Sequence, residues 1–65
     1  MKIFLNGKEF ETNSKNIEEL LVEHNIPQNK VAVEANLEVV PKPQYSNFRL
    51  IENLKVEIIT FVGGG

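Results

Sequence analysis

The 65-residue sequence contains no cysteine and only one histidine. Without cysteine the chain cannot form a disulfide scaffold, a thiolate zinc site or a thiol nucleophile. Small secreted domains usually depend on disulfides, so this absence favours a cytoplasmic protein. The single histidine, His24, has no second histidine or cysteine nearby to complete a metal site. We therefore expect His24 to be structural, and we expect no bound metal or cofactor.

Long apolar runs and a strong excess of one charge are also missing. Seven basic and nine acidic residues give a net charge of −2, and the two signs are interspersed. A weakly acidic chain without a basic patch is a poor candidate for binding nucleic acid or an anionic membrane. No apolar stretch approaches the ~20 residues of a membrane-spanning helix, and the apolar start is too short for a signal-peptide core. The sequence thus predicts neither a nucleic-acid nor a membrane partner.

The chain has little room for a catalytic pocket. A domain of this size buries only about 60% of its extended surface, whereas ligand pockets typically need ~300 Å³ among converging polar groups. Size therefore favours a carrier or a binding module over an enzyme.

The first half of the sequence predicts a β-hairpin followed by a helix. Asn6 and Gly7 separate two short strand-like segments, and both residues tolerate the positive φ of a hairpin turn. Asn16 can cap a helix, with Glu19 three residues later at the position of a capping box. The helix should end near residues 25–26, because Pro27 cannot continue it.

The second half predicts strands at residues 31–35, 38–40 and 55–61. Each apolar sheet face needs a covering layer, and the chain offers one helix to supply it. The order of elements describes an α+β fold of the β-grasp (ubiquitin-like) type, a mixed sheet packed on one main helix. The first and last strands should lie side by side and parallel. We expect a single domain over residues 1–62 and a flexible functional tail over residues 63–65.

The tail is the most informative feature of the chain. Three glycines, Gly63, Gly64 and Gly65, directly follow the last apolar strand. A run of glycine adds no stability to a domain, because glycine loses the most conformational freedom on ordering. Without side chains, however, it can thread a narrow slot and present the terminal carboxylate. A frayed end or a linker remnant is the plainer alternative.

Taken together, these features resemble the ThiS family, the sulfur carrier proteins of bacterial thiamine biosynthesis. The resemblance covers the whole chain and is carried by the Asn-Gly hairpin, the helix with Glu19-Leu20-Leu21, Asn36 at a strand end, Val39-Val40-Pro41, Tyr45 and the terminal glycines. Ubiquitin and MoaD, the carrier for molybdopterin, share the fold and the terminal Gly-Gly.

The resemblance implies a mechanism in which the chain is a cosubstrate and not an enzyme. A ThiF-type enzyme would use ATP to adenylate Gly65, and a persulfide donor protein would convert it to a thiocarboxylate. The sulfur would pass to a thiazole synthase of the ThiG type. Gly64 and Gly63 would pass close to the partner backbone. The alternatives are a MoaD-like sulfur carrier, a ubiquitin-like modifier, and a binding module with an inert tail.

Outward-facing apolar side chains suggest where partners dock. Strand alternation places Phe4, Ile59 and Phe61 on the solvent face of the sheet, where we expect them to cluster near the tail. Glu34 should share this face, either facing a basic partner residue or simply solvated. The helix glutamates, Glu18, Glu19 and Glu23, should form a solvated acidic surface.

Overall fold

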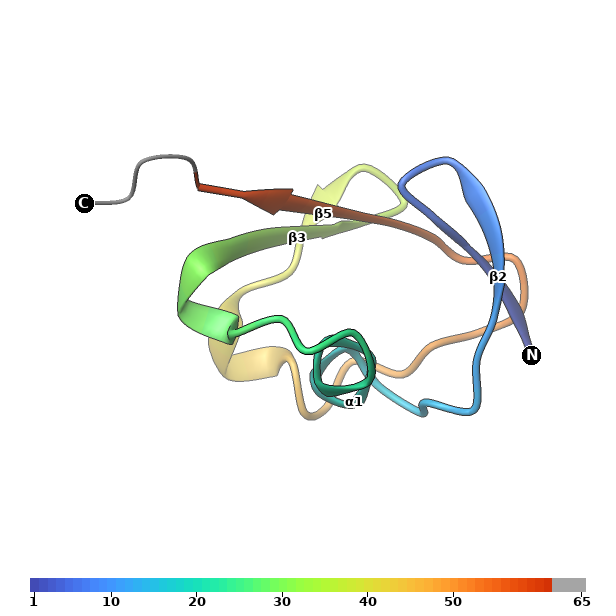
Figure 1. Ribbon diagram of the computed structural model, residues 1–65, viewed down its shortest axis with the longest axis horizontal. Helices are drawn as coiled ribbons and strands as arrows, with labels where there is room; N and C mark the ends of the chain where they lie inside the picture. The colour runs from blue at the N-terminus through green and yellow to red at the C-terminus, as the bar shows by residue number, and fades with distance from the viewer. Residues whose placement is uncertain (62–65) are drawn as a thin grey trace.

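The computed structural model describes residues 1–61. Within them α1 lies against one face of the sheet (Figure 1). The elements in chain order are β1 (Lys2–Leu5), β2 (Lys8–Glu11), α1 (Ile17–Glu23), the 3₁₀ helix η1 (Gln28–Lys30), β3 (Val31–Ala35), β4 (Glu38–Val39), the 3₁₀ helix η2 (Lys42–Gln44) and β5 (Lys55–Thr60). The predicted helix and strands are all present, with ends that lie within three residues of the prediction. The two 3₁₀ helices were not predicted.

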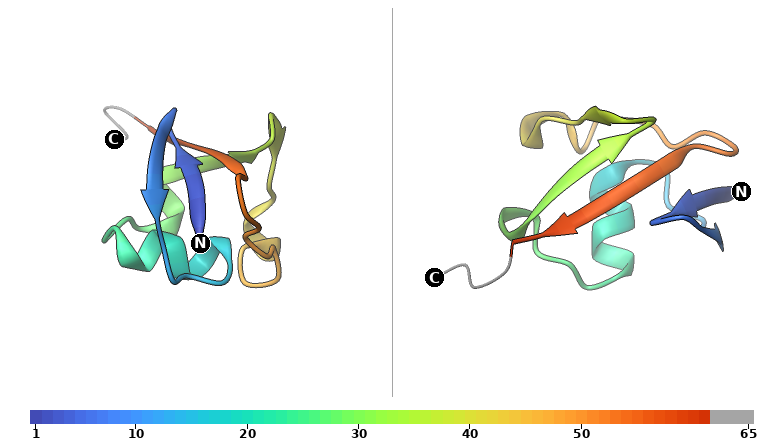
Figure 2. Two further views of the ribbon diagram at one scale, coloured as in Figure 1. Left: turned by 90° about the vertical axis from the view of Figure 1, so that its right-hand side faces the viewer. Right: turned by 90° about the horizontal axis from the view of Figure 1, so that it is seen from above.

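The sheet is mixed, with strand order β2-β1-β5-β3-β4. β5 lies at its centre and runs antiparallel to β3 from Val31↔Thr60 to Ala35↔Val56. On its other side β5 runs parallel to β1, but this pairing covers only Phe4↔Lys55 and Leu5↔Val56. The predicted parallel pairing of the first and last strands is confirmed. β5 therefore extends past the end of β1, toward the side of the molecule opposite the N-terminus (Figure 2).

Tight turns connect the antiparallel pairs β1–β2 and β3–β4. In the β1–β2 turn, Asn6 and Gly7 have φ of 50° and 83°, as the predicted hairpin requires. In the β3–β4 turn, Asn36 and Leu37 have φ of 49° and 72°. Asparagine tolerates this conformation, whereas for leucine it costs roughly 1–2 kcal/mol. Leu37 is 83% exposed, so no packing of its side chain offsets that cost.

The amide groups at the start of α1 are all hydrogen-bonded. Asn16 Oδ1 accepts from the Glu19 N–H at 2.8 Å, as predicted for the cap. The N–H groups of Ile17 and Glu18 donate to carbonyls of the loop after η2, at Phe48 and Tyr45. The Glu19 carboxylate accepts from the Lys15 N–H at 2.9 Å, one residue before the position a capping box uses. These hydrogen bonds join the start of the helix to the loop between η2 and β5.

The left-handed conformation of Asn25 ends the helix, two residues before Pro27. Asn25 has φ of 58°, and its N–H donates to the Val22 carbonyl. The Ile26 N–H donates to the Leu21 carbonyl at 2.9 Å. These two bonds form a Schellman motif, in which a left-handed residue satisfies the last carbonyls of the helix. Ile26 then packs against the core.

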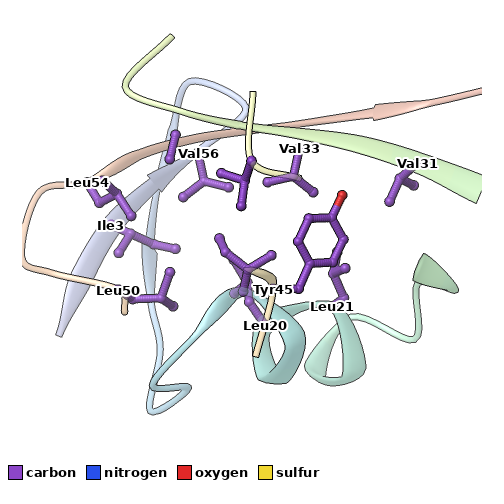
Figure 3. Close-up of a cluster of buried hydrophobic side chains, with 12 residues drawn as sticks. Ile3, Leu20, Leu21, Val31, Val33, Tyr45, Leu50, Leu54 and Val56 are labelled. Atoms are coloured by element: carbon purple, nitrogen blue, oxygen red, sulfur yellow. The ribbon is translucent and has the colours of Figure 1, made fainter. Parts of the chain in front are cut away.

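The core lies between the sheet and α1, and Tyr45 occupies its middle (Figure 3). Tyr45 is only 1% exposed, and burial raises the pKa of its hydroxyl. Phe48 is half-buried against the same cluster. These two aromatics anchor the loop after η2 on the core. The other buried apolar residues are Ile3, Ile17, Leu20, Leu21, Val31, Val33, Ala35, Val40, Leu50, Leu54 and Val56.

Candidate functional site

The candidate site begins where β5 leaves the sheet. Val56 is fully buried and Ile58 packs against the core, so Glu57 and Ile59, which alternate with them along β5, lie on the opposite, outer face of the sheet. Ile59 is 46% exposed and lies opposite Ala32 of β3 on this outer face. The backbone alternation of β5 thus places an apolar side chain in solvent two residues before Phe61.

Phe61 is the residue directly after β5. Its N–H donates at 3.1 Å to the carbonyl of Lys30, the last residue of η1, so backbone hydrogen bonding continues one residue past β5. Its side chain is 54% exposed. The ammonium of Lys42, from η2, lies 5.9 Å from the centre of the Phe61 ring and donates to the Val31 carbonyl at 3.1 Å. Sequence reasoning missed Lys42, whose one local signal is its position between two prolines, Pro41 and Pro43.

Two like charges meet on the same face, next to the apolar residues. Glu34 of β3 lies directly opposite Glu57 of β5, and both are half-buried. Within residues 1–61 neither carboxylate takes part in an ion pair. Like charges directly opposite each other destabilise a sheet. The prediction that Glu34 faces outward is confirmed, and the register adds Glu57 beside it.

The register separates Phe4 from Ile59 and Phe61. Phe4 pairs with Lys55, four residues before Ile59 along β5, a separation of roughly 13 Å. With Gly7, Lys55 and Glu57 it lines an open surface depression of about 290 Å³ at the hairpin end of the sheet. The Lys2 ammonium lies 5.2 Å from its ring centre. Ile59 therefore lies near the end of β5, where the described residues end, and Phe4 lies at the other end of the sheet.

Glu23 and His24, at the C-terminal end of α1, both contact residues that precede the helix. Glu23 is not simply solvated, because its Oε1 accepts from the hydroxyls of Thr12, at 2.6 Å, and Ser14, at 2.8 Å. The Thr12 hydrogen bond in particular holds the pKa of Glu23 below its ordinary value. His24 packs its ring 4.7 Å from that of Phe10, and its Nε2 is buried without a hydrogen-bond partner in the described structure. This packing agrees with a structural histidine.

The three predicted tail residues, Gly63, Gly64 and Gly65, lie outside the described residues. Over residues 1–61 no three His, Cys, Asp or Glu side chains come together in a way that could hold a metal ion. In the same part of the chain, no helix is long and apolar enough to span a membrane.

Comparison with known proteins gives a consistent set of relatives. The model of the ThiS family matches residues 3–65. The sulfur carrier protein ThiS of Bacillus subtilis is 35% identical over 63 residues, which cover 94% of this chain and 96% of that protein. A thiazole synthase of Paramagnetospirillum magneticum is 44% identical over 66 residues. That match covers all of this chain but only 20% of the length of the thiazole synthase.

Solved structures with the same fold also belong to thiamine biosynthesis proteins. The crystal structure of the thiamine biosynthesis protein ThiS from Geobacter metallireducens has a TM-score of 0.84 at 30% identity and covers 100% of both chains. A solution structure of a thiamine biosynthesis protein from the same organism has a TM-score of 0.80 at 30% identity. It covers all of this chain and 88% of that one. The predicted β-grasp sheet on one helix is therefore confirmed.

Proposed function

The chain belongs to the ThiS family, and from this we propose that it is a sulfur carrier for the thiazole moiety of thiamine. One observation carries the proposal: the family match runs through residue 65 and so includes the three terminal glycines. The end of β5 supports it, because the last described residue, Phe61, is hydrogen-bonded to Lys30, the residue before β3.

The reacting group in this proposal is the carboxylate of Gly65. A carboxylate is a poor acyl donor, because its oxygen is a poor leaving group. Attack of the carboxylate on the α-phosphorus of ATP, on a ThiF-type enzyme, releases pyrophosphate and gives an acyl adenylate. The outer sulfur of a protein persulfide then attacks the carbonyl and expels AMP. A second thiol cleaves the resulting acyl disulfide and leaves a thiocarboxylate on Gly65, with a disulfide on the donor side.

Gly64 and Gly63 have a steric role in this scheme. Both must pass through a narrow channel of the adenylating enzyme next to ATP. A Cβ at Gly64 should clash with the partner backbone, and one at Gly63 should be tolerated better. The chain itself contributes no acid, base or nucleophile before its terminus is sulfurated, so we propose a protein cosubstrate that binds no cofactor of its own.

Three partners follow from the proposal: a ThiF-type adenylating enzyme, a persulfide donor protein and a thiazole synthase of the ThiG type. The similarity to the thiazole synthase of Paramagnetospirillum magneticum supports a thiazole synthase partner. In that protein, a segment similar to this chain is part of the same, longer polypeptide. Where the carrier and the thiazole synthase are separate chains, docking would bring them together. No nucleic acid or membrane is required, and a cytoplasmic location suits the ATP-dependent step.

We propose that Ile59 and Phe61 form the docking patch for these partners. Both side chains are about half exposed. Ile59 lies on the outer face of β5, and Phe61 follows directly after the strand. Exposed apolar side chains grouped in this way commonly mark interaction surfaces. Because the register places Phe4 at the other end of the sheet, we do not include it in this patch.

The test is the mass of the intact protein after incubation with ATP, a ThiF-type enzyme and a sulfur source. We expect a gain equal to sulfur replacing one oxygen, located in the C-terminal peptide. The chain contains no cysteine, so an alkylating reagent directed at thiols provides a second readout that is specific for the new thiocarboxylate. Deletion of Gly65 should abolish both signals.

The same incubation separates the proposal from its alternatives. A ubiquitin-like modifier would form conjugates of higher mass with lysine-containing proteins, whereas a sulfur carrier is recovered free after transfer. A chain with an inert tail would show no ATP-dependent change, although the same enzyme sulfurates a known carrier. Either result would overturn the proposed function.

A further inference from the structure

We propose that Lys42 is a positioning residue for the tail, and that its ammonium holds the aromatic ring from which the tail departs. The inference rests on the proposed function, since it concerns how efficiently the Gly65 carboxylate reaches the adenylating enzyme. Its basis is a pair of contacts that the same ammonium makes, one with the edge of β3 and one with Phe61.

The backbone of Lys42 is held in place by its neighbours. Pro41, with φ of −63°, precedes it, and Pro43 follows within the 3₁₀ helix η2. The Lys42 carbonyl accepts from the N–H of Tyr45 at 3.0 Å. Tyr45 is one of the largest side chains in the core and is 1% exposed. The lysine therefore projects from a segment tied to the centre of the molecule, and not from a free loop.

The first contact of the ammonium provides a hydrogen-bond donor for a backbone carbonyl on the β4 side of β3. β4 is only two residues long and pairs with Glu34 and Ala35. Beyond it, the N–H of Val40 donates to the Val33 carbonyl at 2.8 Å. The next carbonyl on this edge is that of Val31, and the backbone turns away at Pro41, which has no N–H to offer. The Lys42 ammonium reaches back and donates to it at 3.1 Å.

The second contact joins that edge to the start of the tail. The Phe61 N–H donates to the Lys30 carbonyl, which fixes the backbone of this residue. The Phe61 ring lies within 5.9 Å of the Lys42 ammonium, inside the range of a cation–π interaction. One anchor on the backbone and one on the ring together define both where residue 61 lies and which way its side chain points. Phe61 is thus held at the point where the described residues end.

This arrangement has a kinetic consequence. If the tail enters the partner only when residue 61 is oriented correctly, the apparent affinity falls in proportion to the fraction of molecules in that orientation. Loss of the Lys42 contact should therefore raise the KM for the carrier and leave kcat at saturation unchanged. An exposed cation–π contact corresponds to a change of roughly threefold.

The matched control is Lys2, whose ammonium lies 5.2 Å from the ring centre of Phe4 at the far end of the sheet. Lys42→Met and Lys2→Met remove the same charge, keep a similar aliphatic side chain, and each abolish one cation–π contact. Lys42→Arg keeps a cation that can both donate to the carbonyl and lie over the ring. We expect Lys42→Met to raise the KM for the carrier about threefold in pyrophosphate release, and Lys2→Met and Lys42→Arg to match the wild type.

A proton NMR measurement tests the contact without any enzyme. The ring current of Phe61 should shift the Hε protons of Lys42 upfield, and Phe61→Leu should return them to the chemical shift of an exposed lysine with no aromatic ring beside it. The proposal is overturned if the shift is absent, or if Lys42→Met has the wild-type KM, or if Lys2→Met raises KM equally. A wild-type chain that is not adenylated at all would instead overturn the proposed function, and with it the positioning role.

Discussion

The side-chain amide of Asn6 pairs with the backbone of Ile58 as a neighbouring strand would. The Ile58 N–H donates to Asn6 Oδ1 at 2.7 Å, and Asn6 Nδ2 donates to the Ile58 carbonyl at 3.4 Å. The backbone pairing of β1 with β5 stops at Val56, so the amide adds one further rung from within the turn. A turn residue selected for positive φ therefore also supports the strand that leads to the tail.

We expect Asn6→Gly to lower the free energy of unfolding by about 1 kcal/mol, because it removes two partly exposed hydrogen bonds while keeping a residue suited to positive φ. Urea denaturation measures the loss. Hydrogen exchange shows where in the structure the loss arises, and the Ile58 amide should exchange faster in the variant.

Asn36→Gly is the control for that substitution. Asn36 has nearly the same φ, and its side chain accepts one hydrogen bond, from the Lys55 N–H at 3.2 Å. Its loss should be smaller and should leave the Ile58 amide unaffected. Equal exchange at Ile58 in the wild type and Asn6→Gly would contradict the role of the Asn6 amide.

Local features of the fold could be predicted from the sequence because short-range chemistry determines them. The turn at Asn6 and Gly7, the cap at Asn16 and the alternation of β3 all depend on residues within a few positions of one another. The parallel pairing of β1 with β5 also followed from the order of the elements.

The arrangement of the candidate site was less predictable, because it depends on how far strands slide past each other. Alternation correctly assigned Ile59 to the outer face, but the offset of β1 against β5 placed Phe4 next to Lys55 instead. Packing of the core sets that offset, and no local pattern reports it. The contact of Lys42 with Val31 spans 11 residues and is likewise set by tertiary structure.

A second prediction concerns the hydroxyl–carboxylate cluster formed by Thr12, Ser14 and Glu23. Thr12 is 3% exposed, and its hydroxyl oxygen accepts from the Ser14 N–H at 3.0 Å while its proton is donated to Glu23. Thr12→Val keeps the shape but leaves the Ser14 N–H without its partner. We expect a loss of about 1–3 kcal/mol in the free energy of unfolding. Ser14→Ala removes one hydroxyl and no amide partner, and should cost less.

The same cluster makes stability depend on pH in a defined direction. The folded pKa of Glu23 lies below its ordinary value of 4.5, chiefly because of the Thr12 hydrogen bond. This contribution is present above the unfolded pKa and is lost as pH falls through the folded pKa. Urea denaturation between about pH 5 and pH 3 should therefore show a shallower decline for Glu23→Gln than for the wild type. If the free energy of unfolding declines with pH equally in both proteins, the hydroxyls of Thr12 and Ser14 do not stabilise the ionised Glu23.

A third prediction is a stabilising change in the β3–β4 turn. Leu37 combines φ of 72° with 83% exposure, so glycine relieves backbone strain there without loss of packing. After allowing for the greater freedom of glycine in the unfolded chain, we expect Leu37→Gly to raise the free energy of unfolding by about 0.5–1 kcal/mol. Leu37→Ala keeps the Cβ and should bring no gain. A Leu37→Gly variant less stable than the wild type would show that the leucine makes contacts in solution.

The last prediction tests the docking patch. Ile59 is 46% exposed on the outer face, opposite Ala32, so Ile59→Asp introduces a charge without entering the core. If the adenylating enzyme covers this face, the aspartate must be desolvated at the interface. We expect binding to weaken at least tenfold, which corresponds to about 1.4 kcal/mol. Isothermal titration calorimetry with the adenylating enzyme measures it, and circular dichroism verifies the fold.

Ile51→Asp is the matched control, since it makes the same substitution at a side chain that is 60% exposed in the loop before β5. That loop lies at the opposite end of β5 from the tail, so a partner that receives the tail should not cover it. Equal weakening by both variants would indicate a nonspecific effect of charge. Wild-type binding by Ile59→Asp would remove the sheet face from the interface and leave the terminal glycines as the main recognition element.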